Sequence, residues 1–292
     1  MSARHTSAAK AYTARVDAVL AQRTRLRGPG PAGEVFAGLP PGHPLLATDP
    51  LRPLDATLEA IARYVQPDDV IVDVGGGGGR TGLPLARRCR EVINVDPSSS
   101  MLAGFAANAR QADITNIRSI HGDWLEVDAP RGTLALVNHV MYLTREIVPF
   151  IKKVEAAASR RVLVTVGSPP PPSRNRLVFQ VCYDESSEMV PGHIELVNVL
   201  WELGIEPDIM MLPVVKGGIE PAASREDAVK LALGQLRGHQ WAFWPLDPAL
   251  EQAARQRVEA QFDALFEATD AGYLPRWTVP AREVLITWET GT

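Results

Sequence analysis

The sequence has few of the features that mark secreted or membrane proteins. It holds only two cysteines in 292 residues, Cys89 and Cys182, which is too few for a disulfide framework and suits a reducing compartment. No apolar run reaches the ~18 residues of a membrane-spanning helix. The first residues also lack the apolar core of a signal peptide. We therefore expect a cytoplasmic protein with no membrane partner.

An excess of positive charge is also missing. The formal net charge is -4, which gives no general reason to bind a nucleic-acid backbone, so we expect no nucleic-acid partner. The cysteines and histidines show no zinc spacing, and we expect no metal site. What is present is an ordinary globular composition, 46% hydrophobic and 22% charged. This composition supplies a large core and leaves an oligomer open.

Apolar segments in the central part of the chain alternate between strand-like and helical spacing. This alternation predicts an α/β fold, a parallel sheet with helices on both faces. Residues 6–26 before it have helical spacing, and residues 28–53 are a loop rich in Gly and Pro. Two helical stretches, 224–238 and 248–268, precede the last strand. The predicted strands are Val70–Val74, Val92–Val95, Ile117–Ile120, Leu134–Val137, Val162–Val166, Asp208–Val215 and Val284–Glu289.

These segments predict one α/β domain with two additions. Residues 1–54 form an N-terminal extension of helix and loop, and residues 55–292 form the main domain. A helical insertion spans about 218–278, before the final strand. It contains an aromatic cluster that fits either the wall of an acceptor pocket or the packing of the insertion onto the sheet. The cluster consists of Trp241, Phe243 and Trp244.

A glycine run follows the first predicted strand. The segment VIVDVGGGGGRTG contains Gly77, Gly79 and Gly82 in GxGxxG spacing. Such glycines let the backbone turn tightly and approach a ligand beside the next helix. The spacing alone also fits a nicotinamide or flavin enzyme. Asp73, which precedes the run, separates the two cases, because a carboxylate there repels a pyrophosphate and attracts a cationic amino group.

The pattern Asp73-x-Gly75-x-Gly77-x-Gly79 resembles the first motif of the class I S-adenosylmethionine (SAM)-dependent methyltransferases. SAM carries both an ammonium and a sulfonium group. The resemblance implies a Rossmann-like, seven-stranded, mostly parallel sheet whose antiparallel last strand inserts between the fifth and sixth. It also implies that Asp73 and these glycines bind SAM.

Further elements follow in the order that this family shows. Asp96 ends the second strand, where a carboxylate can accept hydrogen bonds from ribose hydroxyls, a contact that NAD enzymes share. Pro97 and Met101 join the predicted donor site, although Met101 equally fits core packing. The resemblance implies that Asp123 accepts from the adenine amino group while Trp124 packs on the ring. A simple acidic turn and a core aromatic are the alternatives for these two residues.

The fourth strand leads into the segment Asn138-His139-Val140. In many small-molecule methyltransferases this strand ends in a short polar residue followed by His-Val. The resemblance implies that the backbone of Asn138 meets the methionine part of SAM, while His139 and Tyr142 face the acceptor. His139 is the candidate general base, because histidine commonly exchanges protons near neutral pH. A hydrogen-bonded core histidine is the alternative.

We therefore predict methyl transfer from SAM to a small-molecule acceptor by in-line displacement. Alignment of the reacting groups can supply much of the rate of such a reaction. One alternative is a SAM-binding protein without catalysis. Another is an NAD(P)-dependent oxidoreductase, which leaves Asp73 and Asp123 unexplained. A methyltransferase acting on a macromolecule is disfavoured by the acidic charge balance.

Overall fold

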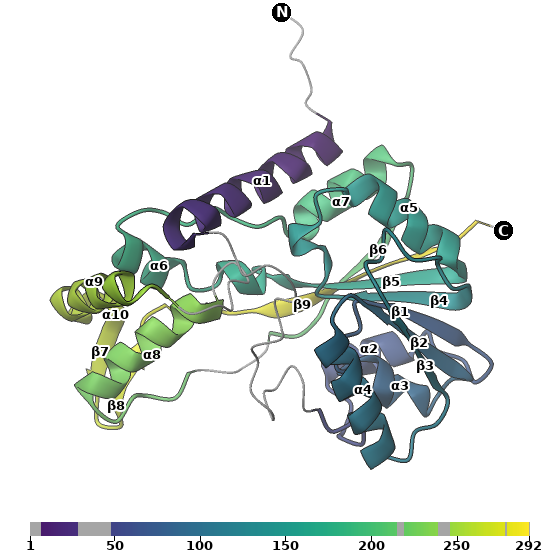
Figure 1. Ribbon diagram of the computed structural model, residues 1–292, viewed down its shortest axis with the longest axis horizontal. Coiled ribbons are helices and arrows are strands. Elements are labelled where there is room, and N and C mark those ends of the chain that lie inside the picture. The colour runs from purple at the N-terminus through teal and green to yellow at the C-terminus, as the bar shows by residue number, and fades with distance from the viewer. Residues whose placement is uncertain (1–6, 29–47, 215–218, 239–245, 278, 292) are drawn as a thin grey trace, which may run out of the picture.

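A seven-stranded sheet runs through the protein in the order β3-β2-β1-β4-β5-β9-β6. The structure is a computed structural model that describes residues 7–28, 48–214, 219–238, 246–277 and 279–291 (Figure 1). The strands of this sheet are β1 Val70–Val74, β2 Glu91–Asp96, β3 Ile117–His121, β4 Gly132–Asn138, β5 Ala158–Ser168, β6 Asp208–Met211 and β9 Arg282–Glu289.

The strand directions confirm the predicted fold class. Neighbouring strands from β3 to β5 are parallel, and β9 is antiparallel to β5 and β6 on either side. Because β9 is reversed, its residue Glu283 lies opposite Gly167 near the end of β5. The beginning of β9 and the carboxyl ends of the parallel strands therefore share one edge of the sheet. That edge is where ligands bind in open α/β sheets.

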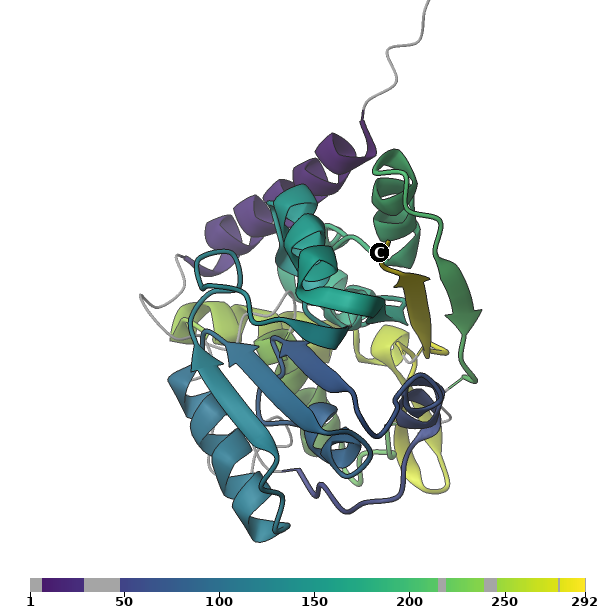
Figure 2. The same cartoon turned by 90° about the vertical axis from the view of Figure 1, so that its right-hand side faces the viewer.

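Helices cover both faces of the sheet (Figures 1 and 2). Side chains alternate along β1, so that Val72 and Val74 enter one core and Ile71 enters the other. The first core lies under α1, α5 and α7, and the second lies under α2, α3 and α4. The bounds of these helices are α1 Ala8–Arg27, α2 Ala56–Ala62, α3 Gly82–Ala86, α4 Ser99–Gln111, α5 Ile147–Ala157 and α7 His193–Glu202.

A third hydrophobic core lies outside the sheet and belongs to the helical insertion. Figure 1 shows its elements gathered at one end of the molecule. The insertion is built from two chain segments, because α6, which follows β5, packs with the helices of the region predicted at 218–278. The aromatic cluster at 241–244 lies outside the described residues. The elements of the insertion are α6 Arg176–Tyr183, α8 Arg225–Gly238, α9 Pro248–Ala260, α10 Phe262–Leu265, β7 Phe266–Thr269 and β8 Gly272–Pro275. Two short 3-10 turns lie elsewhere, η1 Met141–Leu143 and η2 Pro171–Ser173.

The prediction of helix through residue 268 is wrong at its end. Residues 266–269 form β7, which pairs with β8 in a hairpin. Phe266 stacks on Phe262 at a ring distance of 4.8 Å and meets Trp277 edge-on at 5.0 Å. This burial of aromatic rings favours the hairpin over another helical turn. The sixth strand is also shorter than predicted, because β6 ends at Met211.

The N-terminal extension begins with a helix that joins the two parts of the molecule. The Tyr12 hydroxyl donates to the carbonyl of Met141, beside the sheet, at 2.6 Å. At the other end of α1, the Arg27 guanidinium donates to the carbonyl of Leu236 in α8 at 2.9 Å. The helix predicted at 6–26 is thus present as Ala8–Arg27 and is integrated into the fold.

Candidate functional site

The turn between β1 and α3 opens one side of the backbone. Gly77 and Gly79 have φ values of 53° and 86°, the left-handed region that favours glycine. A Cβ at Gly79 would lie 2.5 Å from Leu83 and 2.6 Å from Phe105, so this glycine allows close packing. At Gly77 the nearest atom to such a Cβ is Sδ of Met101, at 3.7 Å. Gly77 therefore leaves room for a ligand to approach the backbone.

Asp73 lies directly beneath this turn. Its side chain is fully buried, and neither carboxylate oxygen has a hydrogen-bond partner of good geometry. A Cβ at Gly76 or Gly82 would lie 2.6 or 2.5 Å from one of these oxygens. Burial and, to a smaller extent, the charge of Asp96 raise the pKa of Asp73 to about 7. A positive charge across the turn would stabilise the ionised form.

Asp96 is held against the same turn at the end of β2. Its Oδ2 accepts from the amide of Gly77 at 2.9 Å, and its Oδ1 accepts from the amide of Ser98 at 2.8 Å. Pro97 follows and is exposed, whereas Met101 is buried in α4 next to Gly77. The structure thus brings together the predicted ribose carboxylate, its two neighbours and the glycine turn.

Asp123 and Trp124 follow β3 but have different surroundings. Asp123 is exposed, and its Oδ1 accepts from the amide of Leu125 at 2.8 Å. Trp124 is buried, with its ring 6.5 Å from that of Phe150 and Nζ of Lys153 5.5 Å from its ring centre. This places Trp124 in the core under α5. Contact of either residue with adenine stays a prediction.

The side chain of Asn138 fastens the end of β4. Its Nδ2 donates to Oγ1 of Thr81 at 2.6 Å, and its Oδ1 accepts from the hydroxyl of Thr165. The next residue but one, Val140, would lie 2.5 Å from a Cβ at Gly75. The end of β4 therefore rests against the glycine turn. The two threonines were not predicted, because nothing local marks them as partners of Asn138.

His139 has both ring nitrogens engaged. Nδ1 lies 2.7 Å from the hydroxyl of Tyr142, and Nε2 lies 3.0 Å from Oε2 of Glu283. The Tyr142 hydroxyl is buried and also accepts from the amide of Gly167 at 2.6 Å. The His139 backbone is left-handed, with φ 58°, and its amide donates to the carbonyl of Thr165. The ring is thus fixed in one orientation.

Tyr142, His139 and Glu283 form a row of polar side chains, and the charges around Glu283 determine which of its forms is favoured. Burial alone would raise the pKa of Glu283, but the hydrogen bond and charge of His139 and the charges of Arg174 and Arg80 hold it below its usual value. Burial raises the pKa of Tyr142, so its hydroxyl stays protonated. The protonated hydroxyl of Tyr142 can therefore donate to Nδ1 of His139, while Nε2 lies within ion-pair distance of Oε2 of Glu283. Glu283 was missed in the sequence, although a carboxylate at the start of a reversed strand was a usable signal.

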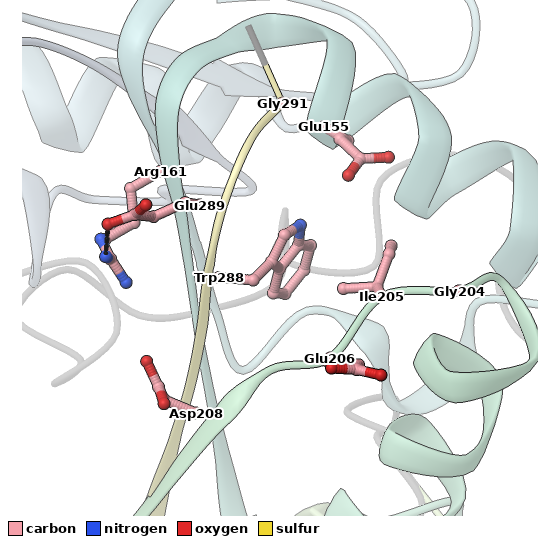
Figure 3. A pocket seen from close by; sticks show the side chains of 9 residues that line it. All are labelled: Glu155, Arg161, Gly204, Ile205, Glu206, Asp208, Trp288, Glu289 and Gly291. Carbon is pink, nitrogen blue, oxygen red and sulfur yellow. Dashed lines mark hydrogen bonds and ion pairs between the residues drawn. The ribbon is translucent and has the colours of Figure 1, made fainter.

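A hollow with a cavity volume of about 480 Å³ lies at the opposite edge of the sheet from the glycine turn (Figure 3). Its lining includes Asp208 at the start of β6 and Trp288 near the end of β9. Arg161 and Glu289, also in its wall, form an ion pair at 2.5 Å. These positions are at the amino ends of the parallel strands, so the hollow is separate from the glycine turn.

Two further findings concern metals and membranes. In the part of the chain that the structure describes, no group of three or more His, Cys, Asp or Glu side chains is arranged to hold a metal ion. Among the same residues, no helix combines the length and apolar character needed to cross a membrane. The expectation of a site without metal stays a prediction.

Part of the chain is similar to known proteins. Residues 71–160 match the family described as a methyltransferase domain. The chain is 27% identical to an uncharacterized protein of Haemophilus influenzae over 183 residues, which cover 60% of this chain and 66% of that protein. It is 33% identical over 119 residues to the 23S rRNA (uracil(1939)-C(5))-methyltransferase RlmD of Aeromonas salmonicida, covering 34% of this chain. The chain therefore spans less than two thirds of these relatives, only 27% in the case of RlmD.

A solved structure shows the same fold. A Bacillus halodurans protein assigned as a methyltransferase superimposes with a TM-score of 0.53 at 14% identity, covering 81% of this chain and 98% of that one. The family match runs from β1 into β5 and so includes the glycine turn, Asp96, Asp123 and Asn138. Residues 71–160 thus match a methyltransferase domain, and the strand order with its reversed β9 agrees with the Rossmann-like fold of methyltransferases.

Proposed function

We propose that the protein transfers a methyl group from SAM to a small-molecule acceptor by in-line displacement in the cytoplasm. One observation carries the proposal: a single edge of the sheet holds both the open glycine turn above Asp73 and the partly exposed, hydrogen-bonded His139. SAM, when bound, supplies a methyl carbon activated by a sulfonium. The two cysteines are buried and unpaired, which suits a reducing compartment.

We propose that five groups along this edge bind the parts of the donor. The backbone at Gly77 is open to a ligand, and the charge of Asp73 beneath the turn favours an ammonium. We propose that Asp96, at the same turn, accepts from the ribose hydroxyls and that the exposed Asp123 accepts from the adenine amino group. We propose that the end of β4 at Asn138 flanks the methionine part.

The acceptor side is proposed to lie at His139 and its partners. His139 keeps 26% of its side chain exposed, while Tyr142 is held behind it. The proposed arrangement of the chain keeps residues 1–54 as an extension and residues 55–292 as the methyltransferase domain. In this arrangement the insertion covers the acceptor. A small acceptor agrees with the net charge of -4, whereas a phosphate backbone would be repelled.

Labelled SAM tests the acceptor class. The protein is incubated with methyl-labelled SAM and either a small-molecule extract of the source cells or their total RNA. We expect label in the small-molecule fraction only. Label in RNA alone would show that the acceptor is a nucleic acid. Binding of S-adenosylhomocysteine without any label transfer would favour the alternative of a SAM-binding protein that does not catalyse.

The variant His139→Ala tests the acceptor side. We expect turnover to fall about 100-fold, the usual scale for losing help with proton transfer, while the affinity for S-adenosylhomocysteine changes little. Steady-state kinetics and calorimetry measure the two effects. His193→Ala, the same change at the start of α7, is the control and should keep both values. Unchanged turnover in His139→Ala would show that this residue has no part in the chemistry.

A further inference from the structure

We infer that Glu283 is a catalytic residue whose Oε1 binds the nucleophilic O–H or N–H group of the acceptor and receives its proton. The inference rests on the proposed function and narrows the acceptor to oxygen and nitrogen nucleophiles. It assigns to β9, the reversed strand, a chemical contribution to the site.

The direction of β9 places Glu283 at the ligand-binding edge. In register, Glu283 lies opposite Gly167, three residues from the Val164 position that pairs with Val137 of β4. The side chain of Glu283 reaches His139, which directly follows β4, with 3.0 Å between Oε2 and Nε2. The carboxylate is therefore beside the strand end where the acceptor is proposed to bind. A parallel last strand would have put this residue at the far edge.

The neighbouring polar groups are already engaged with one another. Both ring nitrogens of His139 have partners, and the hydroxyl of Tyr142 is buried between His139 and the amide of Gly167. Oε1 of Glu283 differs, because it lies 3.9 Å from Nη2 of Arg174, beyond hydrogen-bond distance. The Glu283 side chain keeps 16% of its surface exposed. Oε2 lies 3.0 Å from Nε2 of His139 but is buried without a hydrogen bond of good geometry. The carboxylate of Glu283 therefore keeps capacity to accept a hydrogen bond, and Oε1 is the oxygen turned away from His139.

Fixed positive groups keep this carboxylate ionised, so that it can accept a hydrogen bond. The guanidinium of Arg174 is held by the bond from its Nε to the carbonyl of Pro169 at 3.1 Å. The charges of Arg174 and Arg80 and the hydrogen bond from His139 favour the ionised form of Glu283. An ionised carboxylate accepts hydrogen bonds only. It therefore selects an acceptor whose nucleophilic atom carries a hydrogen to donate. The lone pair of that atom then points away from Glu283.

The chemical step balances with Glu283 as the proton acceptor. The lone pair of the acceptor oxygen or nitrogen forms a bond to the methyl carbon of SAM. The bond between that carbon and sulfur breaks, and its electron pair stays on sulfur, which becomes a neutral thioether. The proton of the nucleophile passes to Oε1 of Glu283 and later to solvent. Nε2 of His139 stays next to Oε2 during the reaction, and this contact keeps the carboxylate oriented.

The variant Glu283→Gln tests this assignment, because it keeps the shape of the side chain but cannot take a proton. Methyl-labelled SAM is supplied with the small-molecule extract, and mass spectrometry identifies the atom that carries the label. We expect O-methyl or N-methyl products and a loss of turnover of about 100-fold. Calorimetry with S-adenosylhomocysteine should give an unchanged Kd, since Glu283 does not bind the donor. Glu289→Gln, at the other end of β9, is the matched control and should stay fully active.

The outcomes distinguish a failure of the role of Glu283 from a failure of the proposed methyl transfer. Methyl groups found only on carbon, or a fully active Glu283→Gln variant, would overturn the role of Glu283 while methyl transfer itself stands. A Glu283→Gln variant that no longer binds S-adenosylhomocysteine would also overturn it. A protein that binds S-adenosylhomocysteine but labels nothing would contradict the proposed function as well. A thermal unfolding midpoint equal to that of the unmodified protein shows that the variant is folded.

Discussion

At the scale of single residues, Asp73 has the most unusual environment in the site. A carboxylate without hydrogen-bond partners beneath a backbone turn is costly when ionised, and its pKa is raised to about 7. The charge of Asp96 on β2 adds to this cost. The folded state therefore binds this proton more tightly than the unfolded chain. The contribution of this proton to the free energy of unfolding is fully present below the pKa of an unfolded aspartate, about 4. It is lost as pH rises toward 7.

The same shift predicts a pH-dependent affinity for the donor product. An ammonium group favours ionised Asp73, so the affinity for S-adenosylhomocysteine should rise between pH 5.5 and pH 7.5, below the usual titration of an α-amino group at about 8. Binding should release a proton in the acidic half of this range. Calorimetry in two buffers of different ionisation enthalpy measures both effects.

The variant Asp73→Asn is the reference for that experiment. It should bind S-adenosylhomocysteine more weakly, by about tenfold or more if one well-placed charge contributes about 1.4 kcal/mol. Its affinity should not change over the same pH range. A wild-type affinity that is flat with pH, or an Asp73→Asn affinity that still rises, would show that Asp73 does not act on the ligand.

At the scale of elements, two glycines in one turn have separate tasks. Alanine at Gly77 would meet only Sδ of Met101, at an ordinary contact distance of 3.7 Å, so it should cost only the ~1–2 kcal/mol of a left-handed residue. Its methyl group nevertheless enters the side proposed for SAM. Alanine at Gly79 would meet Leu83 and Phe105 at 2.5–2.6 Å. Overpacking adds about 1–3 kcal/mol to its backbone strain.

We therefore expect Gly77→Ala to stay folded but lose affinity for S-adenosylhomocysteine by at least about tenfold, or about 1.4 kcal/mol. Gly79→Ala should lose more of its free energy of unfolding. Chemical denaturation and calorimetry on the two variants separate these effects, and each variant is the control of the other. If Gly77→Ala bound as tightly as the unmodified protein, the ligand would not approach the backbone at this glycine.

The sequence was most informative where function depends on strand ends. Asp73 and Asp96 belong to their strands, and periodicity alone puts these residues at one edge of a parallel sheet. The resemblance to a family supplied the direction of the last strand, which no local pattern encodes. The row formed by Tyr142, His139 and Glu283 could not be predicted, because residues more than a hundred positions apart meet only through the register of β9 with β5.

The helical insertion was predicted less completely. The segment α6 was not recognised as part of it, since its partners α8 and α9 follow β6 in the sequence. The predicted helix extends over most of β7, because the aromatic contacts that stabilise the β7–β8 hairpin come from tertiary packing. Local spacing describes which face of a segment is apolar, but it does not identify the segment that covers that face.

At the scale of the whole molecule, α1 ties the sheet to the insertion. Its Tyr12 hydroxyl holds the carbonyl of Met141, the first residue of the turn that carries Tyr142. Farther along, Gln22 donates to Glu185 at 2.7 Å, beyond the end of α6. The extension therefore contacts the turn that carries Tyr142 and the segment after α6. This arrangement links the geometry at His139 to elements at both ends of the molecule.

The central claim is that the glycine turn above Asp73 is built for a cationic amino-acid tail. Calorimetric titration of the unmodified protein with S-adenosylhomocysteine and with NADH, side by side at pH 7.5, tests it most directly. We predict saturable binding of S-adenosylhomocysteine, with stabilisation of about 2.7 kcal/mol at a hundred times its Kd, and no heat of binding from NADH. Binding of NADH, or no binding of S-adenosylhomocysteine, would contradict the account.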